Sequence, residues 1–391
     1  MLGFSMPRIA CGAVILAACF AGATSLYAQS SPPAASDIEH GLAIAPPGGA
    51  PRQLDLSAAM QALHIPSVSV AVIERGRLDW ARAFGTGATA DTLYQAASLS
   101  KLVTAVAALR LVEQGRLALD RNVNDELTAW RLPDSALTRG HPVTLRGLLS
   151  MTGGVGVPGY IGYAPEQPLP NLIQILDGAP PANSPPVRVE YVPGTRYAYS
   201  GGGYEIVQAL IETATRRSFA EAMQELIFRP LGMTNSTFVQ PLPPALARKA
   251  AEGHDASGAP LPGGWRVVPE LAAGGLWSTP TDLAKLLIAI ADAFQGRSTT
   301  FLSPAMARTM VTRQGGGPYG LGGAVAGSGS DLVLMKRGQN VGYQSYMLIF
   351  PETGQGMVVM SGSDNGTTLA TALIRSAAVV YRWPPLGALP D

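Results

Sequence analysis

The sequence is poor in the residues that build disulfides, metal centres and charged interfaces. Its 391 residues contain two cysteines, Cys11 and Cys19, and four histidines that are scattered without the spacing of metal ligands. Charged residues make up only 14% of the chain, and the formal net charge is +1. This balance gives no reason to expect a nucleic-acid partner. We therefore expect neither a metal nor another cofactor.

Several familiar catalytic motifs are also absent. No lysine follows a glycine, which excludes a phosphate-binding P-loop, and the sequence has no Gly-x-Ser-x-Gly elbow. His141 precedes Pro142 and His254 precedes Asp255, so both histidines fall in predicted loops. A conventional Ser-His-Asp triad is therefore disfavoured.

The N-terminus has the pattern of a signal peptide. Arg8 precedes the apolar run Ile9–Phe20, and small residues continue to Ala28. We expect residues 1–28 to be a leader, residues 29–52 to be a linker rich in proline and glycine, and the mature protein to be periplasmic or secreted. In the alternative, Leu16–Cys19 is a lipobox and lipidation at Cys19 anchors the protein to a membrane. No other segment is apolar enough to span one.

Strand patterns occur near both ends of the chain, and helical patterns dominate between them. This arrangement predicts an α+β fold in which the two ends build one sheet and a helical part lies beside it. We assign residues 53–121 and 298–391 to the α/β part and residues 122–297 to the helical part. The predicted strands are 68–73, 78–84, 332–336, 343–350 and 356–361, and the predicted helices are 54–63, 102–114, 144–151, 172–176, 204–215, 219–227, 280–293 and 368–382.

A serine and a lysine open one of these helices. Ser98 and Lys101 are three residues apart, so their side chains leave the same face of a helix that is apolar nearly all round. Burial lowers the pKa of an ammonium group, and such a lysine can take a proton from a hydroxyl. The amide of Ser98 lies in the first turn, where N–H groups can stabilise negative charge. By itself, however, the pattern is more often a helix cap followed by a solvated lysine.

Two further stretches place reactive side chains beside glycines. Tyr199 and Gly201 lie on a glycine-rich turn before a helix, and a tyrosine near ammonium groups can act as a base. Lys336, Gly338 and Gln339 lie between two predicted strands, where Gly338 would let a substrate approach and the amide of Gln339 would hold an oxyanion. In isolation, a packed aromatic residue and a solvated turn are the simpler interpretations.

Taken in order, the three stretches resemble the serine β-lactamase and penicillin-binding-protein superfamily, on its class C-like side. The family pattern is Ser-x-x-Lys, then Tyr-x-Asn, then Lys or His-x-Gly. Further segments fit the same family along nearly the whole mature chain, namely 91–98, 143–154, 193–194, 230–233, 274–283 and 319–322.

The resemblance implies a fold and a set of roles. The fold is an antiparallel sheet flanked by helices with a mostly helical second domain, and the active site lies between them. Ser98 would form an acyl-enzyme, and Lys101 and Tyr199 would share the proton transfers. Lys336 would keep Tyr199 acidic and could hold a substrate carboxylate. The amides of Ser98 and Gln339 would hold the oxyanion, an effect worth a few kcal/mol per donor.

The sequence departs from the family pattern at three positions. Gly201 replaces the asparagine that contacts the lysine and the substrate amide, Arg337 replaces Thr or Gly, and Met151 stands where relatives often carry His. We therefore expect an exported serine hydrolase that acts on a β-lactam, a D-amino-acid peptide or an acyl ester. A carboxylesterase with the same residues, and a binder or sensor that stays acylated, are the alternatives.

Overall fold

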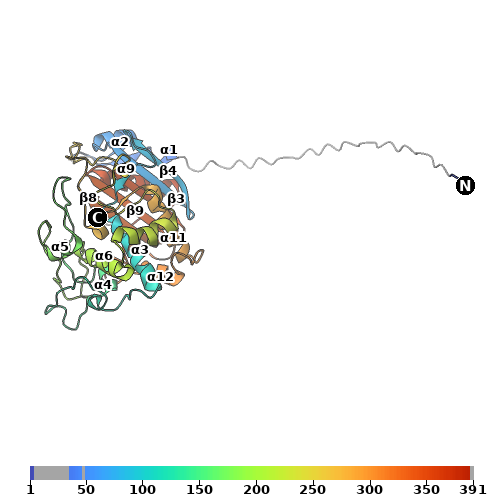
Figure 1. Ribbon diagram of the computed structural model, residues 1–391. Coiled ribbons are helices and arrows are strands. Elements are labelled where there is room, and N and C mark those ends of the chain that lie inside the picture. Colours follow the sequence, from blue (N-terminus) through green and yellow to red (C-terminus); the bar gives the residue numbers. More distant parts are fainter. Residues whose placement is uncertain (4–34, 46–48, 388–391) are drawn as a thin grey trace.

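A six-stranded antiparallel sheet formed by both ends of the chain organises the protein. The computed structural model describes residues 1–3, 35–45 and 49–387. The strand order in this sheet is β4-β3-β10-β9-β8-β7, and the α+β fold class is confirmed. Figure 1 shows the blue N-terminal strands beside the red C-terminal ones. The bounds are Ser67–Glu74 for β3, Arg77–Gly85 for β4, Ala324–Ala326 for β7, Val333–Asn340 for β8, Tyr343–Phe350 for β9 and Gln355–Ser361 for β10.

The two faces of the sheet are covered by different helices, because side chains alternate along each strand. On β3, Val68, Val70 and Val72 pack with α2 (Leu56–Ala62) and α13 (Gly366–Val380) in one buried cluster. Ala71 and Ile73 point to the opposite face and pack with α3 (Leu99–Glu113) and α11 (Pro280–Phe294). The sheet is therefore the middle layer of three.

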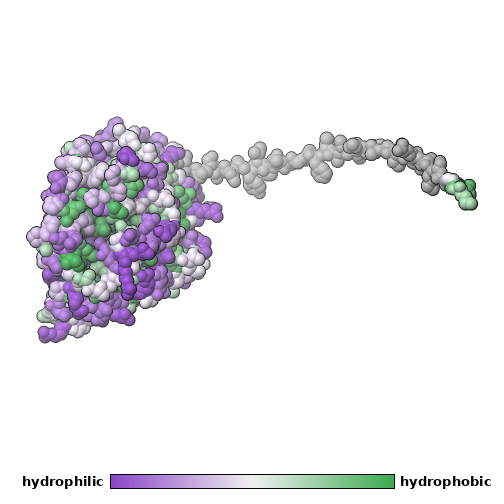
Figure 2. All heavy atoms as spheres, in the orientation of Figure 1, coloured by the Kyte–Doolittle hydropathy of each residue, from purple (hydrophilic) through white to green (hydrophobic). Residues whose placement is uncertain are grey.

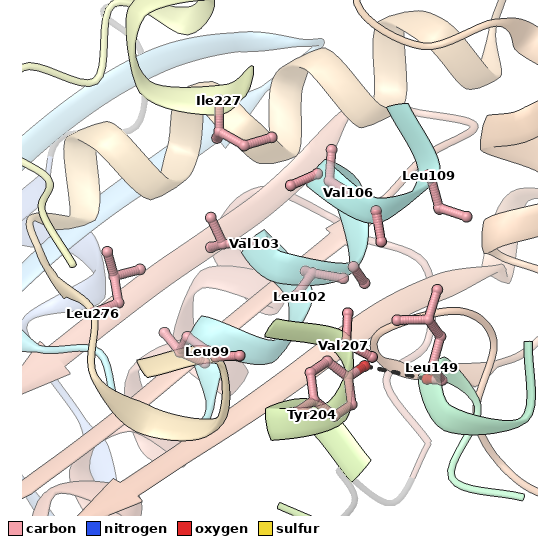
Figure 3. Close-up of a cluster of buried hydrophobic side chains, with 14 of the residues drawn as sticks. Leu99, Leu102, Val103, Val106, Leu109, Leu149, Tyr204, Val207, Ile227 and Leu276 are labelled. Atoms are coloured by element: carbon pink, nitrogen blue, oxygen red, sulfur yellow. Dashed lines mark hydrogen bonds between the residues drawn. The ribbon is translucent and has the colours of Figure 1, made fainter. Parts of the chain in front are cut away.

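Helix α3 runs through the centre of the second cluster. Every residue from Leu99 to Leu109 is buried, which agrees with the predicted all-round apolar character. Figure 3 shows Leu99, Val103 and their neighbours enclosed by side chains from several elements, with the Tyr204 hydroxyl donating to the carbonyl of Leu149 over 3.2 Å. Because the sequence buries this helix on all sides, the groups at its N-terminus are held firmly.

Short helices joined by long loops form the helical part. They are α4 (Leu145–Leu149), α5 (Leu172–Asp177), α6 (Gly202–Thr215), α7 (Phe219–Met223), a π-helical turn (Gln224–Phe228), α8 (Arg229–Leu231), α9 (Pro244–Ala247) and α10 (Leu271–Gly274). The two-residue strands β5 (Tyr94–Gln95) and β6 (Trp277–Ser278) pair with each other, and α12 (Pro304–Met310) follows α11. Helix α11 packs against β3, β4, β9 and β10. The predicted division at residue 297 placed α11 in the helical part, although this helix packs on the sheet.

Part of the segment expected to be a linker is folded. Within residues 29–52, α1 (Ala35–Ile38) and β1 (Leu42–Ile44) contact α13, and β1 pairs with β2 (Arg52–Leu54). Ile38, Leu42 and Ile44 are buried in the cluster on that face of the sheet. Three apolar side chains are too few to give a periodic signal among prolines and glycines, so composition alone predicted a linker.

The leader cannot be compared with the structure. Both cysteines and all but residues 1–3 of the predicted signal peptide fall outside the described residues. Among the helices that are described, none combines the length and apolar character needed to cross a bilayer. Figure 2 shows one face of the molecule, where hydrophilic side chains predominate and apolar ones lie in separate groups.

Candidate active site

The structure brings the three predicted stretches together. Ser98 lies at the start of α3, Tyr199 lies in the loop before α6, and Lys336 lies on β8. The amine of Lys101 donates to Oγ of Ser98 over 3.2 Å, and the amine of Lys336 donates to the Tyr199 hydroxyl over 3.2 Å. Ser98 and Tyr199 both line one pocket, and Ser98 is among the groups that lower the pKa of Tyr199. The serine hydroxyl therefore contacts Lys101 and lies beside Tyr199, two groups that can exchange protons.

Local backbone geometry presents Ser98 to the pocket. Ala97 has a φ of 52°, a left-handed conformation that is uncommon for a residue with a side chain. The hydroxyl of Ser100 donates to the carbonyl of Ala97 and accepts the amide of Leu276, which ties this turn to the neighbouring segment. Ser98 is half-exposed while Leu99 and Ser100 are buried. The strained turn thus exposes a single hydroxyl.

The geometry excludes the simple cap interpretation of Ser98 and Lys101. Ser98 has helical backbone angles, and its hydroxyl makes no capping hydrogen bond. Lys101 is not solvated, since only 1% of its surface is exposed, and its amine donates to the carbonyl of Ala273 over 2.7 Å. The same amine lies 5.2 Å from the centre of the Tyr199 ring. Both residues are therefore placed for chemistry rather than for helix capping.

The electrostatics of the site favour an ionised tyrosine. Burial raises the pKa of Tyr199, but the charges of Lys101 and Lys336 and the hydrogen bonds from Ser98 and Lys336 outweigh it and lower the pKa to about 7. Burial lowers the pKa of Lys336, and the charge of Tyr199 opposes that effect. A tyrosinate is thus available near neutral pH, where an ordinary tyrosine is protonated.

A pocket of about 500 Å³ opens above these groups. Aromatic and proline side chains form one wall, with the rings of Tyr197 and Tyr319 centred 5.4 Å apart. The lining residues are Ser98, Pro158, Gly159, Tyr197, Tyr199, Pro318, Tyr319, Ala324, Met335, Lys336, Arg337 and Gln339. The largely apolar wall and the few polar groups around Ser98 are typical of a small-molecule site.

One edge of the sheet borders the pocket at the predicted oxyanion donors. Strand β7 pairs only with residues 333–335 of β8, so residues 336–340 have no strand on that side. The amide of Ser98 donates to no acceptor within the described residues. That the amides of Ser98 and Gln339 form the oxyanion hole stays a prediction.

The space around Gly338 explains why this position is a glycine. A Cβ at this position would overlap the carbonyl oxygen of Ala96 and lie 3.2 Å from the amide nitrogen of Ser98. The turn before α3 therefore approaches Gly338 closely, and the approach of a substrate to this glycine stays a prediction. Gly338 acts by letting β8 lie directly against the nucleophile.

Replacing this glycine tests the close packing. We expect Gly338→Ala to lower the free energy of unfolding by about 1–3 kcal/mol and to displace the turn that carries Ser98, because backbone atoms cannot yield to the new methyl group. Thermal melts and the rate of Ser98 acylation measure the two effects. Gly387→Ala is the control, since nothing lies within 4 Å of a Cβ there. Equal melting temperatures for both variants would contradict the packing argument.

Gly201 lies beside a tyrosine that the sequence did not indicate. A Cβ on Gly201 would meet Cε2 of Tyr160 at 3.0 Å and the carbonyl oxygen of Pro158 at 3.3 Å. The Tyr160 ring thus fills the space next to this position, and the hydroxyl of Tyr160 has no hydrogen-bond partner among the described residues. The ring of Tyr160, on the loop 155–163, therefore lies close to the place where an asparagine side chain at position 201 would begin.

Sequence reasoning missed the groups behind Lys101. Glu205 and Glu270 are fully buried and lie near this lysine and Tyr160. The available signal was a glutamate inside an apolar helical pattern, Tyr204–Ile211, which a core helix does not need. Within the described ranges, no three His, Cys, Asp or Glu side chains lie close enough to hold a metal ion.

The fold and the site define the class of the protein. An antiparallel sheet with a buried helix that begins at Ser-x-x-Lys, and with a tyrosine and a second lysine across the pocket, is the arrangement of the β-lactamase/transpeptidase-like superfamily. The model of the family described as Beta-lactamase matches residues 55–382, so the chain belongs to this family. Its members are serine hydrolases.

Individual relatives agree with this assignment. The chain is 26% identical to "Penicillin-binding protein 4" of Amycolatopsis lactamdurans over 343 residues, which are 80% of this chain and 84% of the relative. Among solved structures, an octameric penicillin-binding protein homologue from Pyrococcus abyssi has a TM-score of 0.69 at 25% identity and covers 84% of this chain and 76% of its own. A β-lactamase/D-alanine carboxypeptidase from Yersinia pestis shares the fold, with a TM-score of 0.61 at 20% identity, over 82% of this chain and 95% of its own.

Proposed function

We propose that the protein is an exported serine hydrolase that cleaves amide or ester bonds through an acyl-enzyme on Ser98, as a β-lactamase or D-peptidase does. The observation that carries the proposal is that the Ser98 hydroxyl accepts a hydrogen bond from Lys101 inside a pocket that Tyr199 also lines. A hydroxyl becomes an effective nucleophile when a neighbouring base takes its proton as it attacks. Here the base is the Tyr199 phenolate, supported by two ammonium groups.

Acylation uses these groups in one sequence. The hydroxyl of Ser98 gives its proton to the phenolate of Tyr199 while Oγ bonds to the substrate carbonyl carbon, and the carbonyl oxygen becomes an oxyanion facing the amides of Ser98 and Gln339. When the carbonyl re-forms, the bond to the leaving nitrogen or oxygen breaks. The proton then passes from Tyr199 to that leaving group, so the enzyme is left with an ester on Ser98 and its original phenolate.

Deacylation repeats the steps with water. A water molecule gives a proton to the Tyr199 phenolate and its oxygen attacks the ester carbon. The Ser98–acyl bond breaks as Oγ recovers the proton, and the carboxylic acid product leaves. Lys336 and Arg337 line the pocket and can attract a substrate carboxylate.

A carboxylesterase is the second candidate, and Gly201 favours it. In the family motif Tyr-x-Asn, an asparagine at the position of Gly201 contacts the amide of the substrate. The chain instead has a glycine packed against the Tyr160 ring. An ester lacks the amide group that the asparagine recognises, so its absence costs an ester substrate less.

A substrate panel with intact mass measurement tests the proposal. Nitrocefin, p-nitrophenyl esters of short acids and D-Ala-D-Ala peptides are each incubated with the enzyme, and the protein mass is recorded during and after turnover. We expect at least one class to be hydrolysed with a transient acyl adduct on Ser98. A stoichiometric adduct that never turns over would instead support a sensor, and no adduct with any class would contradict the proposal.

The pair Gly201 and Tyr160 gives a prediction about substrate class. We expect Gly201→Asn alone to fold poorly, because its side chain overlaps the Tyr160 ring, and the double variant Tyr160→Ala, Gly201→Asn to recover. The double variant should raise the ratio of amide to ester hydrolysis about tenfold, the discrimination that one recovered hydrogen bond supplies. Tyr160→Ala alone is the control. An unchanged ratio in a folded double variant would contradict this role of Gly201.

Export rests on the N-terminal pattern alone. Residues 1–28 would be removed as a signal peptide, which leaves a periplasmic or secreted protein, and lipidation at Cys19 is the alternative. The mass of the mature protein isolated from a bacterial host distinguishes an unmodified N-terminus after Ala28 from a lipidated Cys19. A cytoplasmic protein that retains residue 1 would contradict both.

A further inference from the structure

Two backbone groups of Ala273 in the short helix α10, which belong to adjacent peptide units, link α6 to Ser98. The amide of Ala273 donates to Oε1 of Glu205 over 3.0 Å, and the carbonyl of the same residue accepts the amine of Lys101 over 2.7 Å. That amine in turn donates to Ser98 over 3.2 Å. Glu205 is therefore three hydrogen bonds away from the reacting hydroxyl and touches neither substrate nor Ser98.

The backbone of the preceding residue, Ala272, provides an internal comparison. The amide of Ala272 donates to Oε1 of Gln208 over 3.2 Å, and the carbonyl of Ala272 accepts the hydroxyl of Thr104 over 3.4 Å. Gln208 lies one turn after Glu205 on the same face of α6, as Thr104 does after Lys101 on α3. Both pairs anchor α10 between the two helices, but only the pair with Glu205 ends at the nucleophile.

We propose that Glu205 is a positioning residue for Lys101, which it holds against Ser98 by anchoring the backbone of Ala273 at its amide. This inference rests on the proposed function, because it concerns the same acylation. Helix α10 has only four residues, so its own hydrogen bonds cannot fix its orientation. A side chain that accepts from its backbone supplies the missing constraint.

The surroundings of Glu205 indicate a neutral acid. The side chain is fully buried, its Oε2 has no partner among the described residues, and the nearby Glu270 is fully buried as well. Burial, and then the charge of Glu270, raises the pKa of Glu205 well above its usual range, and Lys101 offsets this only in part. Burial raises the pKa of Glu270 to about 7. The other groups that face Glu205 are Glu212 on its own helix and the hydroxyl of Tyr160.

A neutral acceptor suits this position. An ionised Glu205 would offset the charge of Lys101, and the pKa of Tyr199 would then rise, because Lys101 is the first of the charges that lower it. A protonated carboxyl can accept the Ala273 amide without that effect. We therefore expect that residue 205 must place an acceptor oxygen at the amide of Ala273, and that this oxygen need not carry a charge.

Three conservative variants separate reach from charge. Glu205→Gln keeps the length and the acceptor, Glu205→Asp keeps the acid but withdraws it by one methylene, and Gln208→Asn makes the same shortening at Ala272. We expect Glu205→Gln to keep kcat/KM for the best panel substrate within about threefold, and Gln208→Asn likewise. Glu205→Asp should lose about 10-fold to 100-fold, mainly in the rate of Ser98 acylation, since small displacements of a catalytic group have such costs.

The pH profile shows whether the loss acts through Lys101. In Glu205→Asp the acid limb of kcat/KM should move to higher pH, because Lys101 lies less firmly beside Tyr199, whereas it should stay in place in the other two variants. All are compared below their melting temperatures. Equal losses in Glu205→Asp and Gln208→Asn, or a folded Glu205→Gln as impaired as Glu205→Asp, would overturn the inference. Should Glu205→Asp not fold, the Glu205→Gln result decides alone. A wild-type enzyme that never acylates Ser98 would instead count against the proposed function.

Discussion

Ser98→Ala is expected to abolish hydrolysis of every substrate that the wild-type protein accepts, while the protein stays folded. The loss should be at least about a thousandfold in kcat, the scale on which removal of a nucleophile acts in acyl-transfer enzymes. The reason is structural, because the Ser98 hydroxyl accepts from Lys101 and lines the same pocket as Tyr199, whose pKa it helps to lower. Intact mass should also show no acyl adduct on the variant.

Ser100→Ala is the matched control in the same turn. Its hydroxyl holds the carbonyl of Ala97 and the amide of Leu276 and does not face the pocket. This variant should lose stability, by about 1–3 kcal/mol for the unsatisfied buried groups, and should still form the acyl-enzyme. Activity that survives in Ser98→Ala on any substrate would show that another residue is the nucleophile for that substrate.

The second large effect concerns Tyr199 and the dependence of activity on pH. In the proposed mechanism Tyr199 acts as a phenolate, so it must first lose its proton. Burial raises the pKa of Tyr199, and the two lysines and hydrogen bonds lower it to about 7. The value of kcat/KM should therefore fall as the pH drops below about 7. In Tyr199→Phe this limb should disappear, with a loss of about 10² to 10⁴ in rate, the usual contribution of a positioned base.

Variants of Lys336 test whether its positive charge lowers the pKa of Tyr199. Lys336→Met removes a positive charge and a hydrogen bond that stabilise the phenolate, so the pKa of Tyr199 should rise and the acid limb should move to higher pH. Lys336→Arg keeps the charge, and its limb should stay closer to that of the wild type. An acid limb that is identical in wild type, Tyr199→Phe and Lys336→Met would identify some other group as the base.

The sequence predicted the layers of the fold well. The apolar residues of 68–73 indicated a strand, and the continuous apolar pattern after Ser98 indicated a buried helix; both elements lie where they were predicted. These signals are local, because the period of a strand or helix is written in consecutive residues. The folded segment at residues 35–44 was not predicted, since its burial depends on α13, far along the chain.

The candidate site was predicted only through the order of its motifs. Ser98-x-x-Lys101 is ambiguous alone, and the later Tyr199 and Lys336 made it informative. Composition and spacing could not show why Gly338 is a glycine or what lies beside Gly201. Each glycine contacts a segment far away in the sequence: Gly338 contacts the turn before α3, and Gly201 contacts the ring of Tyr160.

By itself, the sequence determined the family and predicted the candidate residues, because a serine, a tyrosine and two lysines stand in the order of the family motifs. Only the tertiary structure decided how deeply these residues are buried and which of them carry a proton. Packing buries Lys101, places it and Lys336 beside Tyr199, and thereby lowers the pKa of the tyrosine to about 7. It also places Glu205 behind Lys101. Electrostatic effects of this size need short distances and exclusion of water, and both arise only when segments far apart in sequence pack together.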